Sequence, residues 1–204
     1  MAQSRWAVRF LGAALINGAF GFGIMGVLLY LAVFGRPAAS RIVASGGAGI
    51  WFIVGIIGYG LVGILGIAVA SLFYQYLEAT LKAPYRGWRN YAAWAHLTLG
   101  VVGGSAAALL MAYGGYLAGA AMLPTSVGGG GHLPSDPASF AWVHENILGP
   151  LALPIAALIG VALLGHFIGG VGYATSWWSA RGVSEESRAP AAEWGAATNG
   201  GRKS

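Results

Sequence analysis

The sequence predicts an all-α integral membrane protein, a four-helix transmembrane bundle with both termini in the cytoplasm. Two features of its composition predict this class: 57% of the 204 residues are hydrophobic and only 8% are charged, whereas soluble domains usually contain about 25% charged residues. The third feature is a set of four apolar segments, each longer than the roughly 20 residues that cross a bilayer as a helix. We expect helices because a backbone in lipid must satisfy its own hydrogen bonds.

The four predicted spans follow one another with short connections. To within about 2–4 residues, they lie at residues 8–34, 50–76, 91–123 and 148–178. All are rich in glycine and alanine, which let membrane helices pack closely. Residues 1–182 are therefore predicted to form one transmembrane domain. Residues 183–204 are polar and poor in large apolar side chains, which predicts a disordered cytoplasmic tail.

The basic residues predict the orientation of the chain. Nine of the eleven Lys and Arg residues lie before or at the start of the first span, between the second and third, or after the fourth. Because positive charge concentrates on the cytoplasmic side, this pattern places both termini inside. We expect a multi-pass protein of a prokaryotic plasma membrane. The net charge of +5 is then a topology signal and a headgroup contact, so the expected partner is the lipid bilayer and not nucleic acid.

The absence of cysteine excludes several kinds of chemistry. A chain with no cysteine forms no disulfide, thiolate nucleophile, iron–sulfur cluster or cysteine-ligated zinc site. The four histidines remain as the natural ligands for a soft metal or a haem iron. The chain also lacks a phosphate-binding loop, a nucleophile elbow and an HExxH motif, so we do not expect it to be catalytic by itself.

Two histidines lie inside predicted spans. His96 is about five residues from the inner end of the third span, and His166 is about eight residues from the Tyr173–Ala174 region, where the inner membrane boundary is expected to fall. At 1.5 Å per residue, their depths are about 8 and 12 Å. The two spans are antiparallel, so the two side chains are predicted to face each other at a similar depth.

Small residues accompany both histidines at helical spacing. The stripe on the third span consists of His96, Gly100, Gly103, Ala107 and Met111. The stripe on the fourth span consists of His166, Gly169, Gly170 and Tyr173. Such stripes let helices approach closely, and they also leave room for a flat macrocycle.

Three interpretations of the pair stay open. In the first interpretation, the histidines are helix-packing groups that bond to a hydroxyl or carbonyl of a neighbouring helix. The candidate partners are Asn17, Tyr59, Thr98, Ser105 and Tyr113. Alternatively, His96 and His166 are the axial ligands of a b-type haem, since imidazole is a usual haem ligand and a helix bundle a usual haem site. The remaining roles are quinone contact, proton relay and metal binding, because ionisable residues inside spans are rare and often functional.

A second group of polar residues lies in the outer connection between the third and fourth spans. It consists of His132, Asp136, His144 and Glu145. These are acceptable zinc or copper ligands, so His132 and His144 are candidate metal ligands. Their spacing matches no metal-binding motif, and the main interpretation is that they are solvated loop residues.

The stretches "NYAAWAHLTLGVVGGSAAALLMAYGGYLAG" and "LLGHFIGGVGYA" resemble the histidine-bearing helices of haem-containing respiratory membrane proteins, namely haem-copper oxidases and small four-helix b-type cytochromes. The resemblance covers two of the four spans. It implies haem ligation by His96 and His166, a porphyrin lodged beside Gly100, Gly103, Gly169 and Gly170, and a Tyr173 hydrogen bond to a propionate or a quinone. Haem-copper catalytic subunits are longer and carry six metal-binding histidines, so the resemblance implies a companion subunit.

The leading expectation is therefore a small integral accessory subunit of a respiratory or electron-transfer complex, with haem b as its candidate cofactor. The second is a non-catalytic structural or assembly subunit in which the histidines pack the helices. In both cases the glycine-rich helices favour partner membrane subunits or a homo-oligomer. The third is a small transporter or channel, which the lack of Asp and Glu within the spans and of an inverted repeat disfavours.

Overall fold

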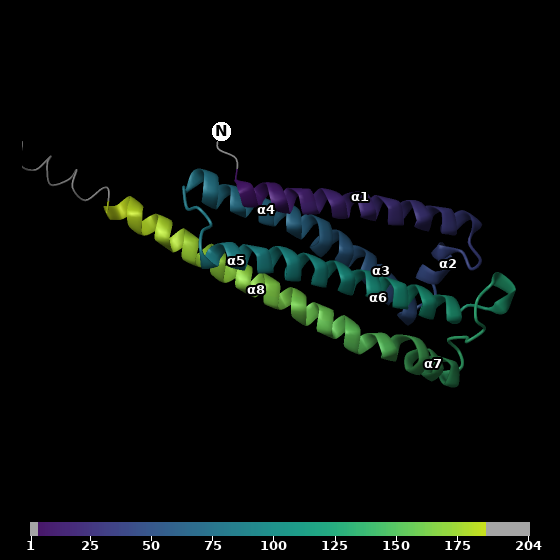
Figure 1. Ribbon diagram of the computed structural model, residues 1–204. Coiled ribbons are helices and arrows are strands. Elements are labelled where there is room, and N and C mark those ends of the chain that lie inside the picture. Colours follow the sequence, from purple (N-terminus) through teal and green to yellow (C-terminus); the bar gives the residue numbers. More distant parts are fainter. Residues whose placement is uncertain (1–3, 187–204) are drawn as a thin grey trace, which may run out of the picture.

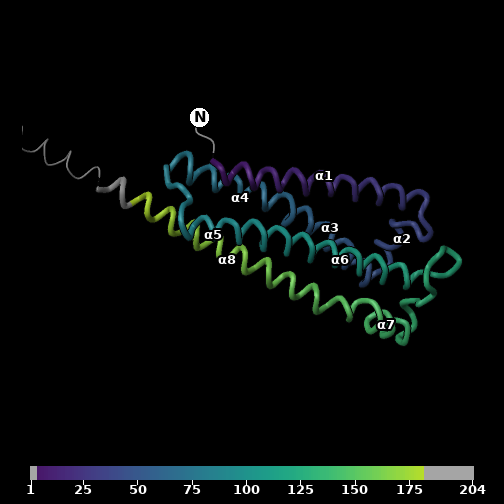
Figure 2. Tube along the Cα trace, in the orientation of Figure 1, coloured from purple at the N-terminus to yellow at the C-terminus, as the bar shows by residue number. Residues whose placement is uncertain are grey.

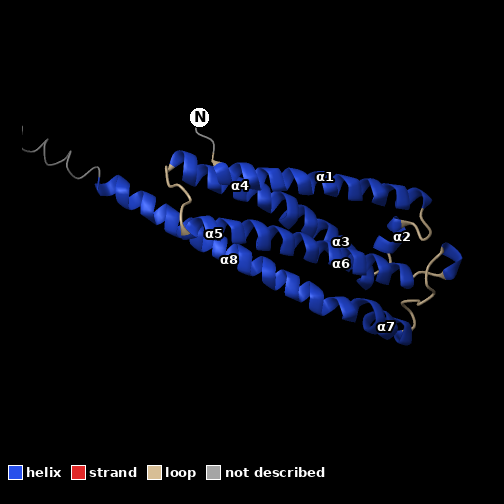
Figure 3. Ribbon diagram, viewed as in Figure 1, coloured by secondary structure: helices blue, strands red, loops and turns tan. Residues whose placement is uncertain are grey.

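A computed structural model describes residues 4–186 of the chain, and these residues form helices joined by loops (Figures 1 and 3). Four helical runs in this part are long and apolar enough to cross a membrane, which confirms the four apolar helices predicted from the sequence. Their bounds are Arg5–Phe34, Gly47–Thr80, Trp88–Ala121 and Pro137–Arg181. Figure 2 shows the runs lying lengthwise beside one another, with both ends of the described chain at the same end of the bundle.

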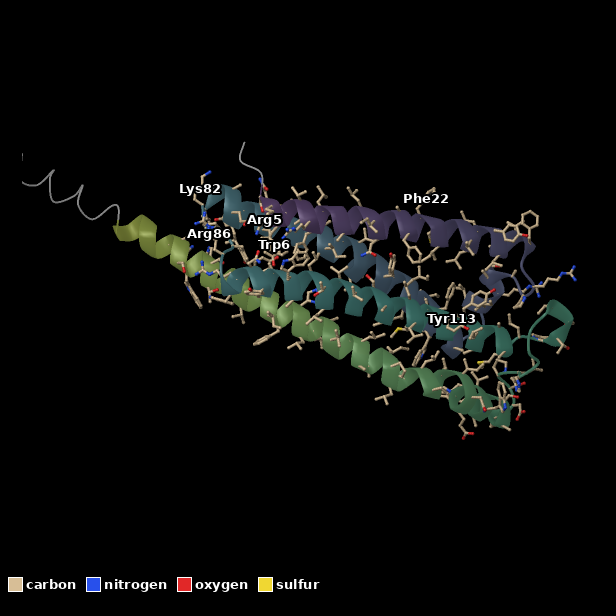
Figure 4. The ribbon with its side chains drawn as sticks, in the orientation of Figure 1. Arg5, Trp6, Phe22, Lys82, Arg86 and Tyr113 are labelled. Carbon is tan, nitrogen blue, oxygen red and sulfur yellow. The ribbon has the colours of Figure 1, made fainter. Side chains whose placement is uncertain are left out.

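The first run is the single helix α1 (Arg5–Phe34). It begins where the Ser4 side chain accepts a hydrogen bond from the backbone N–H of Ala7, a usual N-cap. Only its first turns are buried, and it packs mainly on α4 (Ile67–Gln75). Farther along, Phe22 is 83% exposed and projects outward (Figure 4). A surface this apolar suits contact with lipid chains.

The other three runs each combine α-helix with π-helical turns. The second consists of α3 (Gly47–Gly58), η1 (Tyr59–Gly66), α4 and η2 (Tyr76–Thr80). The third consists of α5 (Trp88–Ala95), η3 (His96–Gly100) and α6 (Val101–Ala121). The fourth consists of α7 (Pro137–Val143), η5 (His144–Leu148) and α8 (Gly149–Glu186). π-helical turns are rare and frequently occur at functional sites, and η3 contains His96.

The connections contain two short helices, α2 (Ala39–Val43) and η4 (Thr125–Val127), on the same end of the bundle as α7 (Figure 1). The turn between η2 and α5 ends at Gly87, whose φ of 57° lies in the left-handed region that glycine adopts without strain. We call the end with this turn the basic end, because it carries Arg5, Lys82 and Arg86 (Figure 4). Arg89 lies there too and donates a hydrogen bond to the Ser179 hydroxyl near the end of the fourth run.

Two predicted boundaries were wrong. The fourth run begins at Pro137 and not near residue 148, because the Asp136 side chain accepts hydrogen bonds from the Ala138 N–H and the Ser139 hydroxyl and so starts a helix in the polar connection. At its other end α8 continues through residues 183–186, which were predicted to belong to a disordered tail. The rest of that tail, residues 187–204, lies outside the described residues.

Backbone contacts between glycine-containing helices set the packing of the bundle. A Cβ atom added at Gly55 of α3 would lie 2.6 Å from the Ala112 Cα of α6, and one added at Gly115 of α6 would lie 2.7 Å from the Phe52 Cα of α3. Such distances leave no room for any side chain. The helices α3 and α6 therefore approach as closely as their backbones allow, as small residues permit in membrane proteins.

An aromatic core lies at the basic end of the bundle. Its fully buried members include Trp6, Phe10 and Tyr74, and Tyr85 of the turn before α5 packs against them. The carboxylate of Glu78 ties three segments together there. It accepts hydrogen bonds from the Ser4 hydroxyl, the Trp6 N–H at 3.3 Å and the Tyr85 N–H at 3.3 Å.

Candidate functional site

The structure brings His96 and His166 into direct contact. Their ring centroids are 5.1 Å apart with an angle of 65° between the ring planes. His96 is buried in η3, whereas His166 of α8 is exposed at the edge of an apolar groove. Two antiparallel runs thus place their histidines at the same level, as the distances from the span ends predicted.

Glycines on each run accommodate the histidine of the other run. A Cβ atom at Gly100 would lie 3.1 Å from Cε1 of His166, and a Cβ atom at Gly169 would lie 2.8 Å from Cβ of His96. The space beside each of these glycines is therefore filled by an imidazole ring. A Cβ atom at Gly170, by contrast, would meet nothing within 4 Å, so Gly170 does not face the pair as its place on the stripe had predicted.

The hydrogen bond of His166 determines its tautomer. Its Nδ1 lies 2.7 Å from the carbonyl oxygen of Ala162, one turn earlier on α8. A carbonyl oxygen only accepts, so Nδ1 carries the hydrogen and Nε2 presents a lone pair. No residue of the described chain bonds to Nε2 of His166. This nitrogen is free to accept a hydrogen bond from a ligand or to bind a metal ion.

Tyr74 is the hydrogen-bond partner of His96, with 3.3 Å between the hydroxyl oxygen and Nδ1. Phe10 and Tyr173 enclose the same imidazole, with centroid distances of 4.9 and 5.7 Å. The Tyr173 hydroxyl donates to the carbonyl oxygen of Ala70 at 3.4 Å. His96 is thus held inside the aromatic core, where Tyr74 also packs on Tyr85 with ring centroids 5.0 Å apart.

The hydroxyl partners proposed from the sequence were wrong. Tyr59 donates to the Asn17 carbonyl oxygen at 2.9 Å, and Thr98 donates to the carbonyl oxygen of Trp94. The residue that sequence reasoning missed was Tyr74, which lies close to the inner end of the predicted second span. A tyrosine inside a span is itself a signal, because its hydroxyl needs a partner in an apolar surrounding.

The groove beside His166 has a volume of about 380 Å³. Residues of α3, η1, α6 and α8 line it, including Val54, Val62, Ala107, Met111, Leu163 and His166. Its size lies within the range of about 300–1,000 Å³ that is typical of small-molecule sites. A second, much smaller cavity of about 10 Å³ adjoins both histidines and Phe10, and it has room for about one water molecule at most.

The packing around the pair does not fit a porphyrin between the two rings. The rings touch, and the backbones of the two runs touch on either side of them. A Cβ atom at Gly165 would lie 2.9 Å from the Leu99 carbonyl carbon, and one at Gly103 would lie 2.9 Å from the Ala162 nitrogen. A macrocycle ligated from both faces would need the two runs to separate. Haem ligation stays a prediction that this arrangement does not favour.

The two outer histidines pack on different aromatic rings. His132 stacks on Trp142, with ring centroids 4.0 Å apart and an angle of 6°, while His144 packs on Phe140 at 4.5 Å. Asp136 caps α7, and the hydrogen bonds from Ser139 and then Ala138 lower the pKa of its carboxyl. Among the side chains that the structure describes, residues 4–181, no three His, Asp or Glu groups are placed together to hold a metal ion.

In comparisons with known proteins, no family model, no curated protein sequence and no solved structure matches the chain.

Proposed function

We propose that the chain is a small integral membrane subunit of an electron-transfer complex in a prokaryotic plasma membrane, with its basic end in the cytoplasm. Four helices of sufficient length and apolarity support the membrane part of this proposal. The collection of Lys and Arg side chains at one end of the described bundle supports the orientation. Residues Arg36 and Arg41 lie at the opposite end.

The observation that carries the proposed role is the contact between His96 and His166. Protonatable side chains inside membrane spans are rare and usually mark a proton or substrate path. Here one ring borders an apolar groove at membrane depth, and the other is hydrogen-bonded to Tyr74 in the core that reaches the basic end. Reactions of lipid-soluble electron carriers release or take up protons with their electrons, so such a complex needs a path of this kind.

The test uses the complex isolated from its native membrane through a tag on this chain. We expect the complex to contain redox centres, and we expect His96→Leu and His166→Leu each to lower electron transfer to an artificial acceptor by about a hundredfold, the usual size of a lost proton-transfer group. Gly170→Ala is the control, because the added methyl group meets open space. A complex without redox centres, or variants that assemble and retain the full rate, would refute the proposal.

Optical spectra of the chain purified without its partners test the haem. A Soret band in the isolated chain that both histidine variants abolish would establish bis-histidine ligation, and it would show that the two runs separate to admit the porphyrin. A colourless folded chain from cells with adequate haem would remove haem b from the proposal. The electron-transfer role itself would be unaffected, because a partner subunit can carry the redox centre.

The fit of Gly100 and Gly169 to the opposite imidazole rings favours a second candidate, a structural or assembly subunit whose histidines join two helices. In that case both leucine variants would lower the melting temperature or the yield of assembled complex. The rate per assembled complex would stay unchanged. The ratio of rate to assembly therefore separates the two candidates.

A further inference from the structure

We infer that the groove beside His166 binds an isoprenoid quinol, whose ring hydroxyl donates a hydrogen bond to Nε2 of His166. This inference rests on the proposed electron-transfer function and names the substrate class of the same site.

The groove lies within the membrane-spanning part of the bundle. Its lining residues come from α3, η1, α6 and α8. Gly58, Gly104, Ala107 and Ala108 are among its lining residues. At these positions little or no side chain stands between the groove and the helix backbones. A flat ring with few projecting atoms can lie against such a surface more closely than a branched or bulky head group.

Hydrocarbon forms the walls, and His166 is the one ionisable side chain among the lining residues. A ligand in such a site gains from burying apolar surface and loses for each polar group left without a partner. A phosphate or a carboxylate would leave charge unpaired, because no lysine or arginine lines the groove. A largely apolar ring with one or two weakly polar substituents is therefore the matching chemistry.

The tautomer of His166 determines which polar substituent the site accepts. The Nδ1–H of His166 donates to the carbonyl oxygen of Ala162 at 2.7 Å, so Nε2 accepts. An oxidised quinone offers only carbonyl oxygens, which also accept and would face a lone pair. A quinol offers hydroxyl groups that donate. The site therefore selects the reduced form of the carrier over the oxidised form.

The side chains at the rim indicate entry from the bilayer. Leu163, Val54 and Ile159 line the groove and are all exposed on the outer surface of the bundle. In a membrane that surface faces lipid chains. A molecule with an isoprenoid tail reaches the groove by lateral diffusion, and its tail remains against the exposed apolar side chains. A water-soluble phenol lacks the tail that this route favours.

The experiment measures binding to the purified full-length chain in lipid nanodiscs, without partner subunits. The probes are a decyl-substituted benzoquinol, its dimethyl ether and the oxidised quinone. We expect the ether and the quinone to bind roughly tenfold more weakly, the factor that corresponds to one lost hydrogen bond. With isotope-labelled histidine, we expect the quinol, and not the ether, to shift the Nε2 resonance of His166. Equal binding of all three probes would overturn the inference.

Matched variants locate the site. Ala107→Leu fills the groove and leaves both histidines in place, so we expect it to abolish quinol binding. Gly160→Leu adds the same side chain on α8, where a Cβ atom meets nothing within 4 Å and which does not line the groove, so we expect unchanged binding. Quinol binding that persists in Ala107→Leu and is lost in Gly160→Leu would overturn the inference. These comparisons stand even if His166→Leu fails to fold.

Three further outcomes decide between occupants of the groove and between the two proposals. Displacement of the quinol by dodecanol at equal affinity would assign the groove to lipid hydroxyls in general and overturn the quinol. Absence of quinol binding to the isolated chain, together with loss of electron transfer in complexes with His166→Leu, would overturn this inference alone. Quinol binding to a chain that joins no redox complex would support the inference and refute the proposed function.

Discussion

The imidazole of His96 occupies the space that a side chain at position 169 would fill. A Cβ atom at Gly169 would lie 2.8 Å from Cβ of His96 and would also collide with its ring. Gly169 thus lets α8 pass directly over η3, and this close passage brings His166 to His96. The backbone of Gly169 in the fourth run and the ring of His96 in the third run therefore together determine the contact between the two histidines.

Gly169→Ala is expected to destabilise the protein. The added methyl group meets atoms at the base of the His96 side chain, which rotation of the ring cannot move away, so we expect a loss of about 1–3 kcal/mol, as for overpacking of a filled core. Gly170→Ala is the neighbouring control, because its methyl group meets nothing within 4 Å. Thermal unfolding in detergent measures both. Equal melting temperatures would contradict the packing of His96 on Gly169.

Gly115→Ala is expected to separate α3 from α6. The new Cβ atom would lie 2.6 Å from the Trp51 carbonyl carbon, and two backbones cannot rearrange as a side chain can. We expect a fall in stability of about 3 kcal/mol, or failure to fold. Gly60→Ala is the control on the second run, since nothing lies within 4 Å of its Cβ position. Cross-linking yields between cysteines introduced on α3 and α6 report the separation.

Glu78→Ala is expected to loosen the first turn of α1. It removes the acceptor for the Ser4 hydroxyl and for the N–H groups of Trp6 and Tyr85, and Glu78 is half-buried. Hydrogen bonds to a charged group are worth about 1.5–3 kcal/mol, and partial exposure reduces this to about 1–2 kcal/mol. The control is Glu145→Ala, because Glu145 is exposed and makes no hydrogen bond to a described residue. Faster amide exchange at Trp6 would support the prediction, and an unchanged rate would refute it.

Tyr85 is expected to make stability fall at alkaline pH. It lies in the turn before α5, outside the spanning runs, and burial raises the pKa of its phenol above the ordinary 10.0. The unfolded chain therefore loses this proton at a lower pH than the folded chain. Its contribution to stability is fully present below pH 10.0 and decreases as the pH rises beyond that value.

Tyr85→Phe removes the ionisable group, so its melting temperature should fall less steeply above pH 10.0 than that of the unaltered chain. Tyr91→Phe is the control, because Tyr91 is highly exposed. Identical pH profiles for Tyr85→Phe and the unaltered chain would show that the phenol of Tyr85 has the same pKa in the folded and the unfolded chain, which would contradict the prediction.

The sequence predicted more of the site than its weak motifs suggested. Counting residues from the basic ends of two antiparallel spans placed His96 and His166 at a similar depth, because the rise of a helix per residue is constant. It could not show which oxygen each ring bonds. The Ala162 carbonyl bonds His166 only because the ring turns back along its own helix. Tyr74 reaches His96 from another run, through packing that no local pattern encodes.

The role of individual glycines was equally beyond the sequence. Gly100, Gly103, Gly169 and Gly170 all lie on the two stripes, yet three are filled by another run and Gly170 faces open space. Periodicity defines the face of a helix, but the angle at which two helices cross decides how far along that face they remain in contact.

By itself, the sequence determined the helical class, the four apolar runs and the segregation of basic residues, because each depends on local composition and on the need of a backbone in lipid to bond to itself. Only the tertiary structure decided that His96 is enclosed by aromatic rings, that the two runs leave no gap for a porphyrin, and that His166 borders a groove. These features arise where separate helices meet, and the contacts there depend on shapes supplied by residues far apart in the chain.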